Sequence, residues 1–333
     1  MFYDTTNASD ILRLLWNPFE EYVEEGMTIY YVPSQLLFQI CLESLPLEDG
    51  TLLGEHYNFV RLSSARELVK NSNSNTFDNA SAILYGGLQY DIDPKLMIER
   101  ARQYDLSSFM TTSKNEVTHG SFIFDKLPGT AVEVEKITKI LHESNIQVTP
   151  YVGEYGTEES FFDMYGKSPN ILHIATHGFF YTPEEASEEN YLRGYTDAML
   201  LSGLIMAGGN SVWRGDSLPD GVLGGVLTAN EIAGIDLRGT DIVVLSSCQS
   251  GRGKVTAEGL YGLQRAFKKA GVNTLVMTLW EISDIETAEF MVAFYERLIK
   301  NNWDKRAAFK EAQIYFREHH PDPYYWAGFV MLD

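Results

Sequence analysis

Two apolar runs, ILHIATHGFF at residues 171–180 and DIVVLSSCQSGRG at residues 241–253, decide how the fold is read. Each run begins as an uninterrupted apolar stretch and ends in one reactive side chain, His177 in the first and Cys248 in the second. Short apolar runs of this kind are typical of strands that are buried on both faces, as in parallel sheets. We therefore expect both runs to be strands of one sheet.

Strand patterns of this type alternate with helical periodicity along most of the chain. Further strands are expected over residues 27–33, 81–87, 146–153, 273–280 and 326–332, and helices over 8–25, 129–144, 157–167, 257–271, 285–301 and 304–320. In the helix at 129–144, Thr130 and Glu133 have the spacing of a capping box, with Thr130 as the N-cap. The alternation predicts an α/β fold with a mainly parallel sheet covered on both faces.

The polar stretch NSNSNTFDNA at residues 71–80 is the best candidate for a linker. It divides the chain into an N-terminal subdomain, residues 1–79, and a main domain, residues 80–333. Within the main domain an irregular insertion, residues 182–225, separates the two opening runs. We expect its ends to form a hairpin and its centre either to gate a site or to be an inert surface loop.

Composition narrows the classes of function. The net charge of −20 argues against direct nucleic-acid binding, which depends on lysine and arginine contacts to phosphates. The two cysteines do not suggest a disulfide framework, and the chain shows neither a secretory signal pattern nor an apolar run long enough for a membrane helix. We expect a cytoplasmic protein that does not associate with membranes. Histidine spacing and the glycine pattern suggest neither a metal site nor a cofactor.

His177 and Cys248 both follow strands, and in an open α/β sheet catalytic groups gather beyond the carboxyl ends of the strands. If the two strands are neighbours, the imidazole can accept the proton of the thiol and make Cys248 a nucleophile. The N–H groups of Gly178 and Cys248 are then candidates to bind an oxyanion. The alternative is structural, because single histidines at strand ends and buried cysteines are common in ordinary cores.

The segments HIATHGFF, DIVVLSSCQSGRGKVTAEGLYGLQRAFKKAGVNTLVMTLWEISD and DPYYWAGFVML resemble the CHAT family of caspase-like cysteine peptidases, which is related to separases and gingipains. The resemblance covers most of the chain and is strongest from about residue 80 onward. It implies a caspase-like three-layer sandwich in which His177 matches the family's catalytic histidine and Cys248 its nucleophile. It also implies that residues 1–79 are an inactive caspase-like half or a join to upstream repeats.

The segment LWEISDIETAEF at residues 279–290 is similar to the separase segment whose aspartate receives an arginine, and the matching residue is Asp284. A carboxylate there can pair with a guanidinium, although Asp284 or Ser283 can equally cap the following helix. Trp280 fits either the substrate pocket or the core.

The resemblance predicts a bacterial cysteine endopeptidase that cleaves a protein or peptide substrate, after a basic residue, and is activated by a protein partner or an upstream repeat domain. The alternative is a non-catalytic caspase-like scaffold that binds signalling partners.

Overall fold

The computed structural model describes residues 5–69, 80–106, 123–181, 197, 199–246 and 257–333. Its main feature is an eight-stranded sheet with the order β1-β2-β11-β10-β9-β5-β3-β4. These strands are β1 (Thr28–Tyr31), β2 (Asn58–Arg61), β3 (Ser81–Leu88), β4 (Gln147–Gly153), β5 (Ile171–Ile174), β9 (Ile242–Leu245), β10 (Thr274–Thr278) and β11 (Phe329–Leu332). The β10–β11 pair is antiparallel, and the other neighbouring pairs are parallel. The predicted α/β fold with a mainly parallel sheet is confirmed.

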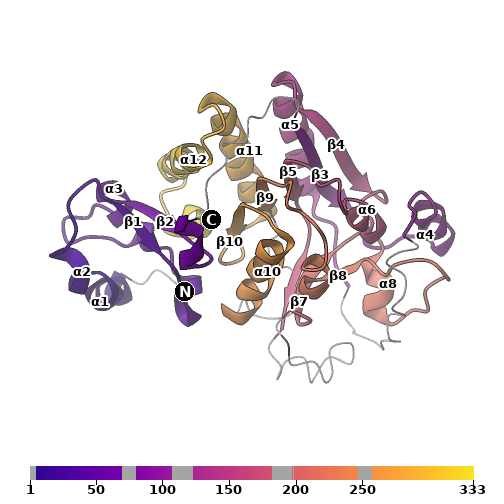
Figure 1. The fold of residues 1–333 in the computed structure, drawn as a ribbon, viewed down its shortest axis with the longest axis horizontal. Helices are drawn as coiled ribbons and strands as arrows, with labels where there is room; N and C mark the ends of the chain where they lie inside the picture. The colour runs from indigo at the N-terminus through magenta and orange to yellow at the C-terminus, as the bar shows by residue number, and fades with distance from the viewer. Residues whose placement is uncertain (1–4, 70–79, 107–122, 182–196, 198, 247–256) are drawn as a thin grey trace.

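Helices cover both faces of this sheet. In Figure 1, α5, α11 and α12 lie on one side and α10 on the other, which gives three layers. The described α-helices are α1 (Thr5–Leu15), α2 (Asn17–Glu20), α3 (Leu53–His56), α4 (Pro94–Ala101), α5 (Pro128–Glu143), α6 (Glu158–Phe162), α8 (Gly209–Arg214), α9 (Ala229–Ile232), α10 (Ala257–Ala270), α11 (Asp284–Lys300), α12 (Lys305–His319) and α13 (Pro323–Trp326). Three short 3-10 helices are η1 (Gln35–Gln39), η2 (Leu42–Ser44) and η3 (Ala65–Val69).

The start of α5 differs from the prediction. Thr130 is not the N-cap, because the helix begins at Pro128 with Leu127 in the cap position. Proline favours the first helical position, since its fixed φ fits there and its missing N–H costs nothing. Thr130 lies one turn inside, where its hydroxyl donates to the Leu127 carbonyl at 2.7 Å and accepts from Gly87 N at 2.8 Å. Glu133 is thereby free of a capping role and points into the core, with 0% exposure.

The first opening run does not form one strand. β5 ends at Ile174, and the chain then enters a second sheet of three antiparallel strands, β6 (Gly178–Phe180), β7 (Ser202–Ile205) and β8 (Val226–Thr228). His177 therefore lies in the junction between the two sheets. The insertion supplies β7 from its middle, whereas β6 precedes the insertion and β8 follows it. Each of these two strands pairs with β7 and not with the other, so the described residues do not form the hairpin expected between the ends of the insertion. The first part of the insertion, residues 182–196, lies outside the described residues, so the expected gating role stays a prediction.

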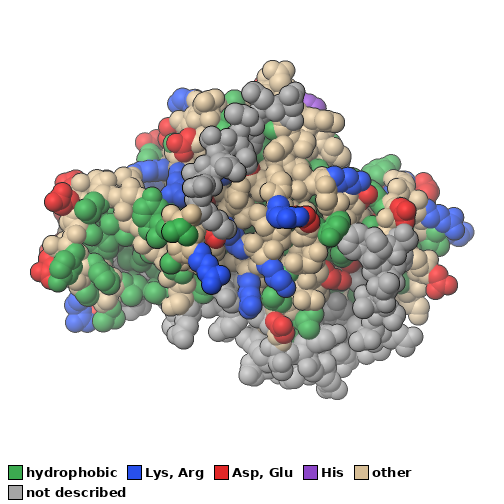
Figure 2. Space-filling model, viewed as in Figure 1, with side chains coloured by type: hydrophobic (Ala, Val, Ile, Leu, Met, Phe, Trp, Pro, Cys, Tyr) green, Lys and Arg blue, Asp and Glu red, His purple; other side chains and the backbone are tan. Residues whose placement is uncertain are grey.

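The N-terminal segment extends the large sheet at one edge. β1 and β2 join it beside β11, through the register pair Leu332 and Arg61. A separate apolar cluster around Leu12, Trp16 and Leu53 packs this end. The expected linker lies almost wholly outside the described residues, so the domain boundary after residue 79 stays a prediction. Figure 2 shows hydrophobic side chains gathered over this N-terminal part. The exposed large apolar residues of the segment include Leu14, Phe19, Tyr22 and Tyr30.

Candidate active site

The two strands that precede the predicted dyad are direct neighbours. β5 pairs with β9 in parallel, with Ile174 opposite Leu245, and the Ser246 N–H donates to the Ile174 carbonyl at 3.0 Å. His177 follows Ile174 by three residues and Cys248 follows Leu245 by the same number. The shared strand edge that the sequence required is present. Cys248 itself lies outside the described residues, so the dyad stays a prediction.

The imidazole of His177 is held by a backbone carbonyl. Its Nε2 lies 2.6 Å from the carbonyl oxygen of Asp125, and the ring makes tilted contacts with Tyr90 and Phe124, with centroid separations of 4.8 and 5.2 Å. A carbonyl can only accept a hydrogen bond, so Nε2 must carry the proton. In the neutral ring Nδ1 is then the basic nitrogen. Nδ1 is buried and has no hydrogen-bond partner among the described residues.

Burial lowers the pKa of His177 below its usual value of 6.5. The hydrogen bond to Asp125 and the carboxylate charges of Asp125 and Asp284 act in the opposite direction, because each favours the imidazolium. Since burial prevails, the resting imidazole is neutral near pH 7. It is a base that can accept a proton at Nδ1.

Gly178, the first residue of β6, has its N–H directed away from the β7 ladder. Ladder bonds join His177 O to Ile205 N at 2.8 Å, and Tyr181 N to Leu201 O at 2.8 Å. Antiparallel strands alternate between residues that bond to the partner and residues that do not, so Gly178 belongs to the second set. Its N–H points outward from β6, an edge strand of the small sheet. This direction suits an oxyanion donor, a role that stays a prediction.

The two predicted specificity residues occupy different surroundings. Ser283 is the N-cap of α11, and Asp284 is the first residue of that helix. Asp284 is half-buried and accepts a hydrogen bond from Gly129 N at 2.8 Å through Oδ2, which ties α11 to the start of α5. It lies near enough for its charge to act on His177. Trp280 is buried in the main core, and its Nε1 donates to the Tyr324 carbonyl at 2.8 Å.

A buried polar network lies beneath the strand ends and has no counterpart in the sequence interpretation. Ser246 donates from its hydroxyl to Glu133 Oε2 at 2.9 Å. Glu133 Oε1 and His173 Nε2 are 3.0 Å apart but not aligned as a hydrogen bond, so we treat this contact as electrostatic. Tyr295 OH lies 3.4 Å from His173 Nδ1. The one signal available in the sequence was the position of Ser246, two residues before Cys248.

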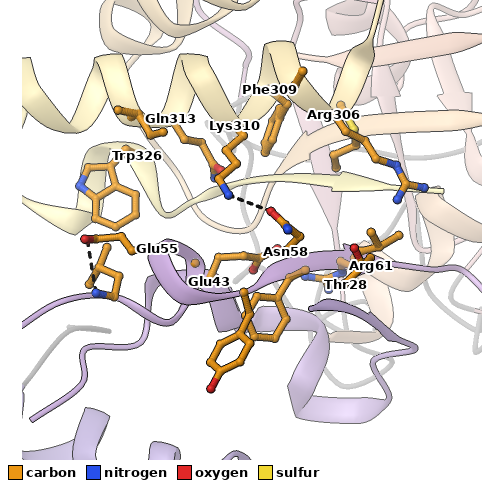
Figure 3. Close-up of a pocket in the computed structure, with 18 of the residues that line it drawn as sticks. Thr28, Glu43, Glu55, Asn58, Arg61, Arg306, Phe309, Lys310, Gln313 and Trp326 are labelled. Carbon is orange, nitrogen blue, oxygen red and sulfur yellow. Dashed lines mark hydrogen bonds between the residues drawn. The ribbon is translucent and has the colours of Figure 1, made fainter. Parts of the chain in front are cut away.

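A cavity of about 720 Å³ lies elsewhere, between the N-terminal strands and α12. Figure 3 shows Lys310 of α12 reaching toward Asn58 of β2, with Arg61, Arg306 and Trp326 also on its walls. Lys310 Nζ donates to Asn58 Oδ1 at 2.9 Å. None of the predicted site residues lines this cavity, so it is separate from the His177 site.

Two absences hold for the described part of the chain. It contains no cluster of three or more His, Cys, Asp or Glu side chains arranged to hold a metal ion. It also contains no helix with the length and apolar character needed to cross a membrane.

The chain was compared with known proteins. It is 36% identical over 110 residues to Tetratricopeptide repeat protein 28 of Mus musculus, and 34% identical over 109 residues to that of Homo sapiens; each match covers 32% of this chain. The chain spans only 4% of the length of these relatives. A crystal structure of the Arg-specific cysteine proteinase gingipain R aligns with 98% of this chain and 69% of its own, at 9% identity and a TM-score of 0.49. The model of the CHAT domain family matches residues 5–333, and the chain therefore belongs to that family.

Proposed function

We propose that this protein is a cysteine endopeptidase in which His177 and Cys248 form the catalytic dyad. The observation that carries the proposal is the state of His177. Its Nε2–H is fixed on the Asp125 carbonyl, which leaves Nδ1 as the basic nitrogen, at the end of the strand beside the one that leads to Cys248. A general base needs this combination of a fixed tautomer and an available lone pair.

In this mechanism the Cys248 thiol gives its proton to His177 Nδ1, and the sulfur attacks the scissile carbonyl carbon. The N–H groups of Gly178 and Cys248 stabilise the oxyanion of the tetrahedral intermediate. The imidazolium then protonates the leaving amine as the C–N bond breaks, leaving a thioester. Water, deprotonated by the neutral imidazole, hydrolyses the thioester and regenerates the thiol. The Asp125 carbonyl stabilises the transient imidazolium through Nε2–H.

The position of Asp284 supports the proposed cleavage after a basic residue. Its carboxylate is half-buried, and one oxygen is oriented by Gly129 N–H. A carboxylate held in this way forms a stronger pair with an incoming guanidinium than an exposed, mobile one, because part of its orientation is already fixed. The same charge acts on His177, which supports its being close to the reaction centre.

Control by a protein partner or by repeats is the remaining part of the proposal. The curated relatives are named for tetratricopeptide repeats. On this chain, the exposed Leu14, Phe19 and Tyr22 of the N-terminal segment are 67%, 59% and 72% accessible. Large apolar side chains grouped on a surface are typical of protein interaction sites. They support a partner that docks on this segment.

The test is a fluorogenic peptide library varied at the residue before the cleaved bond. We expect turnover after Arg or Lys, and a fall of at least about 10³-fold in Cys248→Ala, because the nucleophile is lost. Asp284→Asn is expected to lower the preference for Arg by about 10-fold or more, since the charged pair is removed. Glu281→Gln, which changes an exposed acid in the loop just before α11, is the matched control. Loss of the preference in the control alone would reject Asp284 as the specificity residue.

A second candidate, a non-catalytic scaffold, is favoured by the burial of His177, whose side chain is 1% exposed. A peptidyl acyloxymethyl ketone separates the two functions even when peptides are not turned over. A dyad predicts that Cys248 is alkylated much faster in the wild-type protein than in His177→Ala. Equal, slow alkylation in both would establish the scaffold.

A further inference from the structure

The carbonyl that orients His177 belongs to a short segment that is itself held from one side. Phe124, the residue before Asp125, forms two hydrogen bonds with the side-chain amide of Asn210. Its N–H donates to Asn210 Oδ1 at 2.8 Å, and its carbonyl accepts from Asn210 Nδ2 at 3.1 Å. A side-chain amide that bonds both the N–H and the carbonyl of Phe124 fixes the orientation of the backbone at that residue. The backbone then continues in a fixed direction into Asp125, whose carbonyl binds His177.

The Asn210 side chain has only one arrangement that satisfies its surroundings. It is 0% exposed, and its Nδ2 also donates to Asp91 Oδ2 at 2.8 Å. Its backbone N–H donates to the Tyr90 carbonyl at 3.0 Å. Rotating the amide by half a turn would set Nδ2 against the Phe124 N–H and Oδ1 against two acceptors. In a buried site such mismatches are costly, so the orientation is fixed.

The helix that contains Asn210 also holds the Phe124 ring. Trp213, in the same helix α8, is 2% exposed and meets the Phe124 ring edge-on at a centroid distance of 5.0 Å. The Phe124 ring also contacts the imidazole of His177, at a centroid distance of 5.2 Å. Through one backbone clamp and one ring contact, α8 therefore determines both the hydrogen-bond partner of His177 and one wall of its pocket.

We propose that Asn210 is a positioning residue for His177, acting through the Phe124–Asp125 backbone to hold Nε2–H and present Nδ1 to the thiol. The proposal rests on the proposed function, in which Nδ1 is the base. It assigns to the insertion, residues 182–225, a share in the catalytic apparatus that its sequence did not indicate. Asn210 does not touch the substrate, and its effect is exerted on the tautomer and direction of His177.

Two variants separate hydrogen bonding from packing. Asn210→Ala removes the clamp. Asn210→Asp keeps the shape of the side chain but sets a carboxylate oxygen against the Phe124 carbonyl and Asp91. If Asn210 merely filled space, this substitution would have little effect. Asn170→Ala is the control: the side-chain oxygen of Asn170 also accepts a backbone N–H, that of Ser81 at 2.9 Å, but Asn170 lies just before β5, at the end of that strand opposite His177.

The first readout is the tautomer of His177, measured by NMR of protein labelled with ¹⁵N-histidine and assigned by the signal missing in His177→Gln. We expect a single Nε2–H tautomer in the wild type and in Asn170→Ala, and a mixture of tautomers in both Asn210 variants. The second readout is peptide hydrolysis. We expect kcat to fall by about 10- to 100-fold in the Asn210 variants with KM nearly unchanged, because the base is misdirected while substrate contacts remain.

An unchanged tautomer in both Asn210 variants, or a changed tautomer with kcat within about 2-fold of wild type, overturns the proposal. If the Asn210 variants do not fold, Asp91→Ala decides, since it removes only the outer acceptor at a more exposed position and should give the same tautomer change in smaller degree. If the Asn210 variants shift the tautomer but Cys248 proves inert, the peptidase function is rejected and the role of Asn210 in holding His177 is retained. If the Asn210 variants keep full activity and an unaltered tautomer, the role of Asn210 is rejected and the peptidase function is retained.

Discussion

The contact between Ser246 and Glu133 predicts a strong energetic coupling beneath the strand end that leads to Cys248. Ser246 is 2% exposed and Glu133 0% exposed, and the hydroxyl donates to the carboxylate at 2.9 Å. Hydrogen bonds to charged groups contribute about 1.5–3 kcal/mol net, and a buried partner left unpaired costs about 1–3 kcal/mol. Ser246→Ala should therefore lower the free energy of unfolding by about 2 kcal/mol.

Glu133→Met is the second substitution of a double-mutant cycle with Ser246→Ala. Methionine is chosen because it has a length similar to that of glutamate and no polar oxygen. Alone it leaves the Ser246 hydroxyl unpaired and removes the charge near His173, and we expect a loss of about 2–4 kcal/mol. In the double variant both partners are apolar, which is far less costly than leaving one polar group unpaired. The two losses should therefore fall short of additive by about 2 kcal/mol.

The measurement is urea unfolding of the four proteins, comparing midpoints where the slopes agree. Ser160→Ala is the matched control. It is a buried serine whose hydroxyl bonds to Thr157 and Tyr85, so its combination with Glu133→Met should be additive within about 0.5 kcal/mol. If the effects of Ser246→Ala and Glu133→Met are as additive as those of the control pair, the hydrogen bond between Ser246 and Glu133 does not stabilise this strand end, and the predicted coupling is refuted.

Two further predictions concern the junction of the sheets. Because burial lowers the pKa of His177 below 6.5, the unfolded chain binds this proton first as the pH falls, and stability rises with pH up to about 6.5. His177→Gln should weaken that rise, measured as unfolding free energies at about pH 5.5 and 7.5; an identical rise in both proteins would contradict the burial effect. Gly203→Ala would press a methyl group against the Leu227 carbonyl and lie 2.6 Å from the Phe179 ring. It should cost about 1–3 kcal/mol or more, whereas Gly234→Ala, with its nearest neighbour at 3.3 Å, should have little effect on the melting temperature.

The sheet and the neighbouring strands were predictable because they follow from local pattern. Buried parallel strands need uninterrupted apolar runs, and the helices between them need apolar residues that repeat with a period of 3.6. The order of strands and helices can therefore be predicted from the sequence. The pairing of β5 with β9 could then be expected, because the rules for strand connections leave few possible sheet topologies. The course of the chain after Ile174 was not predictable in this way. A continuous apolar run does not reveal that its last residues leave one sheet for another.

The supports of the site were missed because their partners are distant in sequence. Phe124 and Asn210 are separated by 86 residues, and Glu133 and Ser246 by 113. No periodicity connects such pairs, since their meeting depends on how whole elements pack. The capping-box spacing also led to the wrong role for Glu133. Local rules compete there, and Pro128 fixed the helix start before Thr130 could serve as a cap.

These supports bear on why a dyad motif alone is weak evidence of activity. The base function proposed for His177 requires Nε2 to be occupied, and its occupant is a backbone carbonyl that any residue at position 125 would supply. What must be specific is the geometry of that carbonyl, which depends on Asn210 in the insertion and on the packing of α8. A chain can therefore keep histidine and cysteine at the strand ends and still lose the base, through a change far from either motif. For a member of the CHAT family, the residues that orient the histidine should be assessed together with the dyad itself.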